Sequence, residues 1–456
     1  MMARAEAVPA GRAVAALALL AALGAGVTWL RWQPHDVPPE LMPSRAVSHE
    51  VSAANQTAYP TSFASALREA DSELGFDLGR AVPGGGWLMQ AMVGNSYLKR
   101  ARLTGSFDDY ALAGAAYDRA FAVADPGFGP HLERASYSLT VHRLDWVEPD
   151  LARIDRYAVP VDAATRSAIT GMRGDLLFYR GRYGEALALY EQSRTLAKGM
   201  SSSFRLANYW AKMGDPDLAL RYISEAESGV DHYQQQILSF LETQRGIIEM
   251  NRGRWDKAAR HFVRANAIFP GDWRIEEQIG RALALNGDAA RAMAVYKRIA
   301  ARTNSPEAMD DVASLYRASG DQPNADAWAK RAGMLWNGRL ARLPEAAYGH
   351  ALKHYLAFGD PGEALAMARR NHAARPYAES AVILASALIA NRRPAEALRA
   401  IEPVLLSGWV SADQHIVAAQ AYALLGRGGE ADAERRKALA INPRILDDNA
   451  GVSWTE

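Results

Sequence analysis

Small and apolar residues recur along most of the chain at intervals of three and four, the spacing of helices that bury one face. The segments 181–187, 253–259 and 359–365 align with one another, each with glycine first and alanine sixth. That glycine, or the residue in its place, serves as a phase marker that returns about every 36 residues, at Gly105, His142, Gly181, Gly214, Gly253, Gly287, Gly320, Gly359, Arg392 and Gly426. This regularity predicts one long array of repeated helix pairs.

Side chains at fixed distances from the markers explain the repeat physically. Alanine stands five residues after every marker from Gly181 to Gly426, and alanine or glycine stands seven residues before most of them. Small residues at two matched points allow two antiparallel helices to approach closely. Larger groups one turn later fill the remaining space: Tyr190, Phe262 and Tyr296. Prolines seventeen residues after their markers indicate where the second helix ends: Pro270, Pro376 and Pro443.

The turns also carry signals for the start of a helix. Asp215–Pro216 and Asp360–Pro361 each place an N-cap acid before a proline at the first helical position. No stretch alternates apolar and polar residues over the length of a strand with β-branched enrichment, so strands are not expected. The pattern predicts an all-α fold.

These features together resemble the tetratricopeptide repeat. The shared features are a small residue in the first helix, alanine and an aromatic in the second, and the closing proline, and they cover about residues 87–443. The first two repeats depart from the pattern, because Tyr110 and Val147 replace the alanine. The resemblance implies a right-handed α-solenoid of about eight to ten antiparallel helix pairs, with a concave groove lined by first helices.

The N-terminus reads as a membrane signal. Residues 1–12 contain Arg4 and Arg12 and are expected in the cytoplasm; residues 13–31 form an apolar run with no charge before Arg31. The run is either a transmembrane anchor or a signal peptide cleaved after Gly24, and its continuation to Leu30 favours the anchor. Either alternative places the array in the periplasm, anchored to the inner membrane or secreted.

Three further segments lie outside the array. Residues 32–60 are rich in proline and read as a spacer. Residues 61–86 contain an apolar stripe from Thr61 to Leu74, which predicts a short helix, and then a glycine-rich loop. Residues 444–456 form a polar tail with Trp454, which reads either as a binding peptide or as a frayed end.

Composition excludes several classes of protein. The 52 Lys and Arg against 51 Asp and Glu give a net charge of +1, which lacks the positive field of a nucleic-acid binder. The absence of cysteine excludes disulfides, thiolate metal sites, a cysteine nucleophile and a lipoprotein anchor. No serine-hydrolase elbow, phosphate loop or dinucleotide fingerprint occurs, so neither a catalytic residue nor a bound cofactor is predicted, and an enzyme is not expected.

Two histidines are weak candidates for metal binding. His350 and His354 are four residues apart, which places both rings on one side of a helix. The glutamate of a zincin motif and a third ligand are both missing from the sequence around them, so packing or surface histidines are the favoured interpretation.

The groove of the array is the candidate partner site. Arg205, Asn208 and Lys212 recur on one helix at spacings of three and four and are expected to form a polar ridge, which Arg281 and Arg317 extend at nearby phases. In some tetratricopeptide proteins asparagine and basic residues at similar positions clamp the terminal carboxylate of a peptide. Three tryptophans at helix phases are expected in the core (Trp210, Trp255 and Trp328), whereas two in stretches read as irregular are contact candidates (Trp336 and Trp409).

The resulting functional hypothesis is a membrane-tethered scaffold in the envelope of a Gram-negative bacterium that holds partner proteins and binds no nucleic acid. The alternative is a periplasmic solenoid that binds polysaccharide or metal in its groove.

Overall fold

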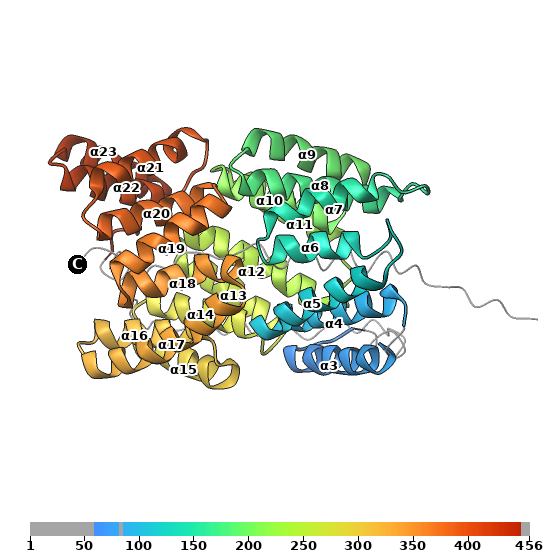
Figure 1. The fold of residues 1–456 in the computed structure, drawn as a ribbon. Helices are drawn as coiled ribbons and strands as arrows, with labels where there is room; N and C mark the ends of the chain where they lie inside the picture. Colours follow the sequence, from blue (N-terminus) through green and yellow to red (C-terminus); the bar gives the residue numbers. More distant parts are fainter. Residues whose placement is uncertain (1–58, 82–84, 448–456) are drawn as a thin grey trace, which may run out of the picture. The chain divides into compact units, whose positions relative to one another are not determined.

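The computed structural model describes residues 59–81 and 85–447. This part of the chain is made of α-helices (Figure 1), with one short 3-10 helix and no strand in the described residues. The all-α prediction is confirmed. The helices are α3 Phe63–Arg80, α4 Trp87–Thr104, α5 Phe107–Val123, α6 His131–Thr140, η2 Leu144–Trp146, α7 Val147–Ile154, α8 Ala163–Tyr179, α9 Tyr183–Leu196, α10 Met200–Lys212, α11 Pro216–Ser228, α12 Gln235–Asn251, α13 Trp255–Ile268, α14 Trp273–Leu285, α15 Ala289–Thr303, α16 Pro306–Ala318, α17 Gln322–Arg342, α18 Pro344–Phe358, α19 Pro361–Ala374, α20 Ala378–Ala390, α21 Pro394–Leu406, α22 Ala412–Leu424 and α23 Gly428–Ile441.

Several predicted segments lie outside the described residues. These are the cytoplasmic segment 1–12, the anchor or signal peptide 13–31, most of the spacer, and the tail from residue 448. Within 59–81 and 85–447, no helix is both long and apolar enough to cross a membrane. The helix predicted from Thr61 to Leu74 is present as α3, which continues to Arg80.

The chain divides into two compact units. Unit 1 contains Ala70–Gly229 and Met334–Glu434, so it is built from two separate runs of repeats. Unit 2 contains Val230–Gly333, the described residues up to Glu69, and those from Arg435 onward. Helices α3, α17 and α23 contain residues of both units.

Consecutive helices pack as pairs joined by short turns, as α8 with α9, α12 with α13 and α20 with α21. The small residues at the predicted phases are what permit this approach. A Cβ atom on Gly174 would lie 2.6 Å from the Tyr190 ring, and one on Gly246 would lie 2.4 Å from the Phe262 ring. The alanines five residues after the markers are buried, from Ala186 to Ala431. The tetratricopeptide-like helix pairs expected from the sequence are therefore confirmed.

The first repeat makes the same contact in a different register. A Cβ atom on Gly94 of α4 would lie 2.6 Å from the Tyr117 ring of α5. Relative to Gly174 and Tyr190, both residues are about one helical turn further from the connecting turn. Tyr110 therefore stands where the later repeats carry alanine because the small-to-large contact has moved along both helices.

The phase markers have a common backbone conformation. Gly105, Gly181 and most other markers have positive φ, and so do the two that are not glycine, His142 (φ 60°) and Arg392 (φ 56°). After most markers the next residue donates its N–H back to the preceding helix, as Arg182 N to Leu177 O at 2.9 Å, which is the Schellman C-cap. After Gly105, Ser106 N donates to the Thr104 hydroxyl instead. Gly359 is the exception, with φ −103°.

In unit 1 the turns of the first run meet the loops of the second run. Leu343, before α18, packs in one buried cluster with Tyr137 and Val141, next to the His142 turn. At the Gly181 turn, Ala378 N donates to the Tyr183 hydroxyl at 2.8 Å. At the Gly214 turn, Val410 N donates to the Lys212 carbonyl at 2.9 Å. The loop residues Leu343, Pro376 and Trp409 are spaced 33 residues apart, so the junctions repeat with the array.

Unit 2 contains a junction of the same kind. A Cβ atom on Gly253 would lie 2.3 Å from Asn442 Oδ1, and the Arg444 guanidinium lies 3.7 Å from the centre of the Trp255 ring. The beginning of the predicted tail, at residue 444, is thus packed against a repeat.

Candidate binding pocket in unit 1

A small pocket opens where the two runs of unit 1 meet. Side chains from α6, α8, α9, α10, the start of α20 and the loop before α22 line it: Ser136, Leu139, Thr140, Asp175, Phe178, Tyr179, Tyr190, Arg205, Asn208, Lys212, Tyr377, Glu379 and Trp409. Its volume of about 50 Å³ is enough for about four water-sized groups. The pocket therefore fits the end of one amino-acid side chain and is too small to enclose a drug-sized ligand.

The structure places three of the predicted ridge residues in the wall of this pocket. Arg205, Asn208 and Lys212 lie on α10, about one helical turn apart on the same face. They belong to the first helix of their pair, which is where the resemblance expects groove residues. Their role in binding a partner stays a prediction.

Arg205 is buried and paired. Its guanidinium donates to the Asp175 carboxylate at 2.9 Å and to Ser201 Oγ at 2.8 Å. The Tyr190 hydroxyl donates to the same carboxylate at 3.0 Å. Burial opposes the charge of Arg205, but Asp175 outweighs it and raises the pKa of Arg205 above its usual value. This pair is held on several sides and contributes no free positive charge to the pocket.

Lys212 is paired with a residue from the other run. Its ammonium contacts the Glu379 carboxylate, and Tyr377 donates its hydroxyl to the same carboxylate at 3.1 Å. Burial raises the pKa of Tyr377 well above its usual range, so this hydroxyl stays protonated and acts as a donor. The two cations of the predicted polar ridge, Arg205 and Lys212, are thus neutralised by Asp175 and Glu379.

Asn208 differs from its two neighbours. It is half-buried between them, and within the described part of the chain its amide makes no hydrogen bond. An amide offers donors and an acceptor together, so this position can bind either kind of polar group. Asn208 is the polar side chain of the pocket that is open to a ligand.

Aromatic rings form the rest of the wall and include a corrected prediction. Trp409 is 3% exposed and packs on Phe178 and Tyr377 with ring centroids 5.9 and 6.3 Å apart. Trp336 lies inside α17, is 1% exposed, and stacks with His350. Trp409 does lie in an irregular stretch, as predicted, whereas the same prediction for Trp336 was wrong because this residue lies inside α17. Neither ring is accessible, because each fills a space between packed helices.

The remaining predicted residues lie elsewhere. Arg281, on α14, and Arg317, on α16, belong to unit 2 and do not line this pocket. His350 is exposed and His354 is buried on α18. Among the described residues, no group of three or more His, Cys, Asp or Glu side chains is arranged to hold a metal ion.

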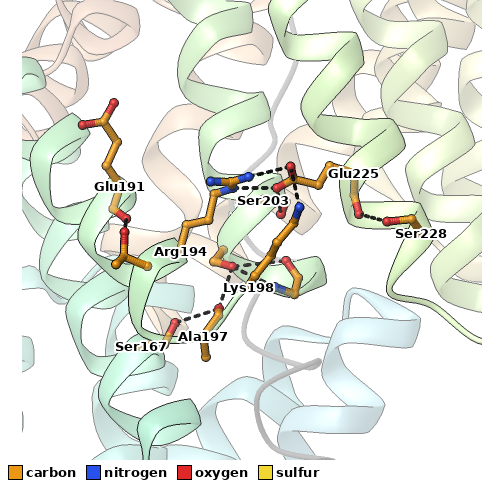
Figure 2. A network of polar contacts seen from close by, with 11 residues as sticks. Ser167, Glu191, Arg194, Ala197, Lys198, Ser203, Glu225 and Ser228 are labelled. Carbon is orange, nitrogen blue, oxygen red and sulfur yellow. Dashed lines mark hydrogen bonds and ion pairs between the residues drawn. The ribbon is translucent and has the colours of Figure 1, made fainter.

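A polar network fixes the repeat that carries the pocket residues (Figure 2). Glu225 of α11 accepts from Arg194 of α9 at 2.6 and 2.7 Å and from Ser203 of α10 at 2.7 Å, and Lys198 lies 3.1 Å away. Hydrogen bonds from Arg194 lower the pKa of Glu225 to about 2. Three successive helices are joined at one carboxylate, so α10 presents its pocket residues from a supported position.

Sequence reasoning missed the acidic half of the pocket. Glu379 lies 167 residues after Lys212, and no local pattern links them. Asp175 stands 30 residues before Arg205 on the preceding first helix, a spacing close to one repeat. That spacing is a signal that could have identified the Asp175 pair; Glu379 has no comparable signal.

No protein-family model matches the chain, and no curated protein is significantly similar to it. Among solved structures it is similar to a tetratricopeptide repeat protein from Parabacteroides merdae ATCC 43184, at 15% identity over 53% of this chain and 93% of that chain, with a TM-score of 0.32. It is also similar to the APC/C hetero-tetramer Cut9–Hcn1 (14% identity, 84% of this chain and 82% of that chain, TM-score 0.36) and to the human IFIT1 dimer with m7Gppp-AAAA (11% identity, 84% and 95%, TM-score 0.38). The description of the chain as a tetratricopeptide-like helical-repeat protein rests on its own helix pairs.

Proposed function

We propose that the protein is a membrane-tethered scaffold of the bacterial envelope and that unit 1 binds a segment of a partner protein at the pocket beside α10. The observation that carries the proposal is the open amide of Asn208 in a pocket sized for one side chain. Repeated helix pairs present such side chains at regular intervals along a surface, which suits the binding of an extended or helical segment.

The apolar run of residues 13–31 supports the tether and the periplasmic placement of the array. Arg317 of unit 2 and Arg281, which is 7% exposed, are further candidate contact residues for a protein partner. The volume of the pocket favours a protein segment over the alternative ligand, a polysaccharide.

The test is affinity purification of the full chain from its native membrane in mild detergent, followed by mass spectrometry of intact subunits. Wild type is compared with Asn208→Ala and with Gln322→Ala, which changes an exposed side chain of unit 2. We expect a stoichiometric partner with wild type and Gln322→Ala, and at least a tenfold loss with Asn208→Ala. The intact mass of the chain also shows whether it is cleaved after Gly24.

A chain recovered without a protein partner contradicts the scaffold proposal. Metal and glycan binding would then be measured on the same material. A partner retained equally by all three chains would keep the scaffold and exclude the pocket as its site.

A further inference from the structure

An acidic side chain from the second run of repeats forms part of the wall of the unit 1 pocket. Glu379 lies in the first turn of α20, in the second run of repeats, and its carboxylate contacts the Lys212 ammonium of the first run. The Lys212 ammonium also lies 5.2 Å from the centre of the Trp409 ring. A carboxylate from outside the chain would find at this place a cation, an aromatic wall and the open amide of Asn208.

The two ion pairs of the pocket differ in how easily they can be exchanged. The Arg205 side chain is 5% exposed and is fixed by Asp175 and Ser201 on its own run. The Lys212 and Glu379 side chains are 23% and 30% exposed. Partly solvated ion pairs contribute little net stability, because water solvates both partners when they separate. The Lys212–Glu379 bridge is therefore the replaceable pair.

Two backbone amides of the second run donate hydrogen bonds to the first run next to this bridge. They are Ala378 N to the Tyr183 hydroxyl and Val410 N to the Lys212 carbonyl, 2.8 and 2.9 Å long. Both amides stand at loop–helix boundaries and donate from one run to the other. Their protection from solvent exchange therefore reports whether the junction is closed.

We infer that Glu379 is an internal competitor for an aspartate or glutamate side chain of the partner segment, which replaces it on Lys212 and hydrogen-bonds to Asn208. This inference rests on the proposed function. The charge of Lys212 favours an acidic partner group, because displacing Glu379 leaves the Lys212 ammonium without a counterion. Arg205 needs no such group, because it remains paired with Asp175. Competition by Glu379 keeps the site closed until a segment with a matching acid and apolar neighbours arrives.

The first test measures closure with the full chain in mild detergent and needs no partner. Hydrogen–deuterium exchange is followed in peptides covering residues 376–381 and 408–412 for wild type, Glu379→Gln and Glu396→Gln. The control also removes an acid from the second run, but Glu396 pairs with Arg393 within that run. We expect Glu379→Gln to raise the exchange rate of the Ala378 and Val410 amides about two- to fivefold, as expected for a partly solvated ion pair. Glu396→Gln should leave these exchange rates unchanged, and neither variant should change the urea midpoint.

The second test uses a defined probe, N-acetyl-glutamate N-methylamide, with the corresponding glutamine compound as the neutral control. We expect the acidic probe to bind Glu379→Gln about two- to fivefold more tightly than wild type, and Lys212→Gln to lose binding. The glutamine compound is expected to bind all three chains equally weakly.

Two results would overturn the inference. One is exchange of the Ala378 and Val410 amides at the wild-type rate in Glu379→Gln, which means that the bridge does not control the junction. The other is equal affinity of wild type and Glu379→Gln for the acidic probe. If a partner is still recovered from membranes in either case, the proposed function is retained and only the competition by Glu379 is rejected.

Discussion

Replacing Arg392 with glycine is expected to stabilise unit 1 although it removes a whole side chain. Arg392 has φ 56°, is exposed, and makes no side-chain hydrogen bond or ion pair within the described residues. A left-handed conformation costs a non-glycine residue about 1–2 kcal/mol. Glycine has greater freedom in the unfolded chain than arginine, which reduces the gain in folding stability by about 0.5–1 kcal/mol. The net expectation for Arg392→Gly is a gain of about 0.5–1 kcal/mol in the free energy of unfolding.

Two matched variants isolate the backbone effect. Arg399→Gly makes the same chemical change at an exposed site inside α21 and should cost about 1 kcal/mol. Gly426→Ala makes the opposite change at the equivalent turn, where φ is 72° and a Cβ meets open space, and should also cost about 1 kcal/mol. Urea unfolding followed by circular dichroism measures all three, and hydrogen exchange of α20 and α21 assigns the change to unit 1. A loss of stability in Arg392→Gly equal to that in Arg399→Gly would refute the reasoning.

Three further predictions concern packing and pH. Gly246→Ala should cost about 1–3 kcal/mol in urea unfolding because the new Cβ would lie 2.4 Å from Phe262, and a second change, Phe262→Leu, should recover part of the loss. The stability that Glu225 contributes through Arg194 should be complete above pH 4.5 and be lost as the pH falls toward 2. The urea midpoint of Glu225→Gln should therefore fall less between pH 4.5 and pH 2 than that of wild type. The same fall in both chains would contradict the role of the network. Burial holds the pKa of His142 well below its usual 6.5, so the unfolded chain takes up a proton that the folded chain does not. Stability should therefore fall as the pH drops below 6.5, and His142→Asn should reduce that slope, while His372, whose pKa burial also lowers, keeps part of it.

The repeat was predictable from the sequence because its signals are local. A marker with positive φ, a small residue against an aromatic ring and a closing proline all act within one helix pair. These local signals predicted the turns at His142 and Arg392 although neither residue is glycine. The first repeat shows the limit of counting positions, because its contact between Gly94 and Tyr117 lies about one turn away from the common register.

The packing of one run on another was not predictable in this way. Each residue at the junctions can also be explained by a role inside its own run. Tyr183 starts a helix, Trp409 lies in a loop, and Glu379 is an acid suited to a helix N-terminus. Their partners lie far away in the sequence, so no spacing points to them. Glu379 on Lys212 is an example: the sequence predicted a polar ridge on α10 and gave no sign of this carboxylate.

The regular junctions of unit 1 also limit how this protein can change in length. An ordinary solenoid gains or loses one repeat with little effect on distant ones, because each repeat contacts only its neighbours. Here the loops at Leu343, Pro376 and Trp409 each pack against one successive turn of the first run. Deleting one repeat from either run would shift the pairing, so that every later loop of the second run would lie opposite a turn of the first run that it does not normally contact. Duplication or loss of repeats in this lineage would therefore have to occur in both runs together.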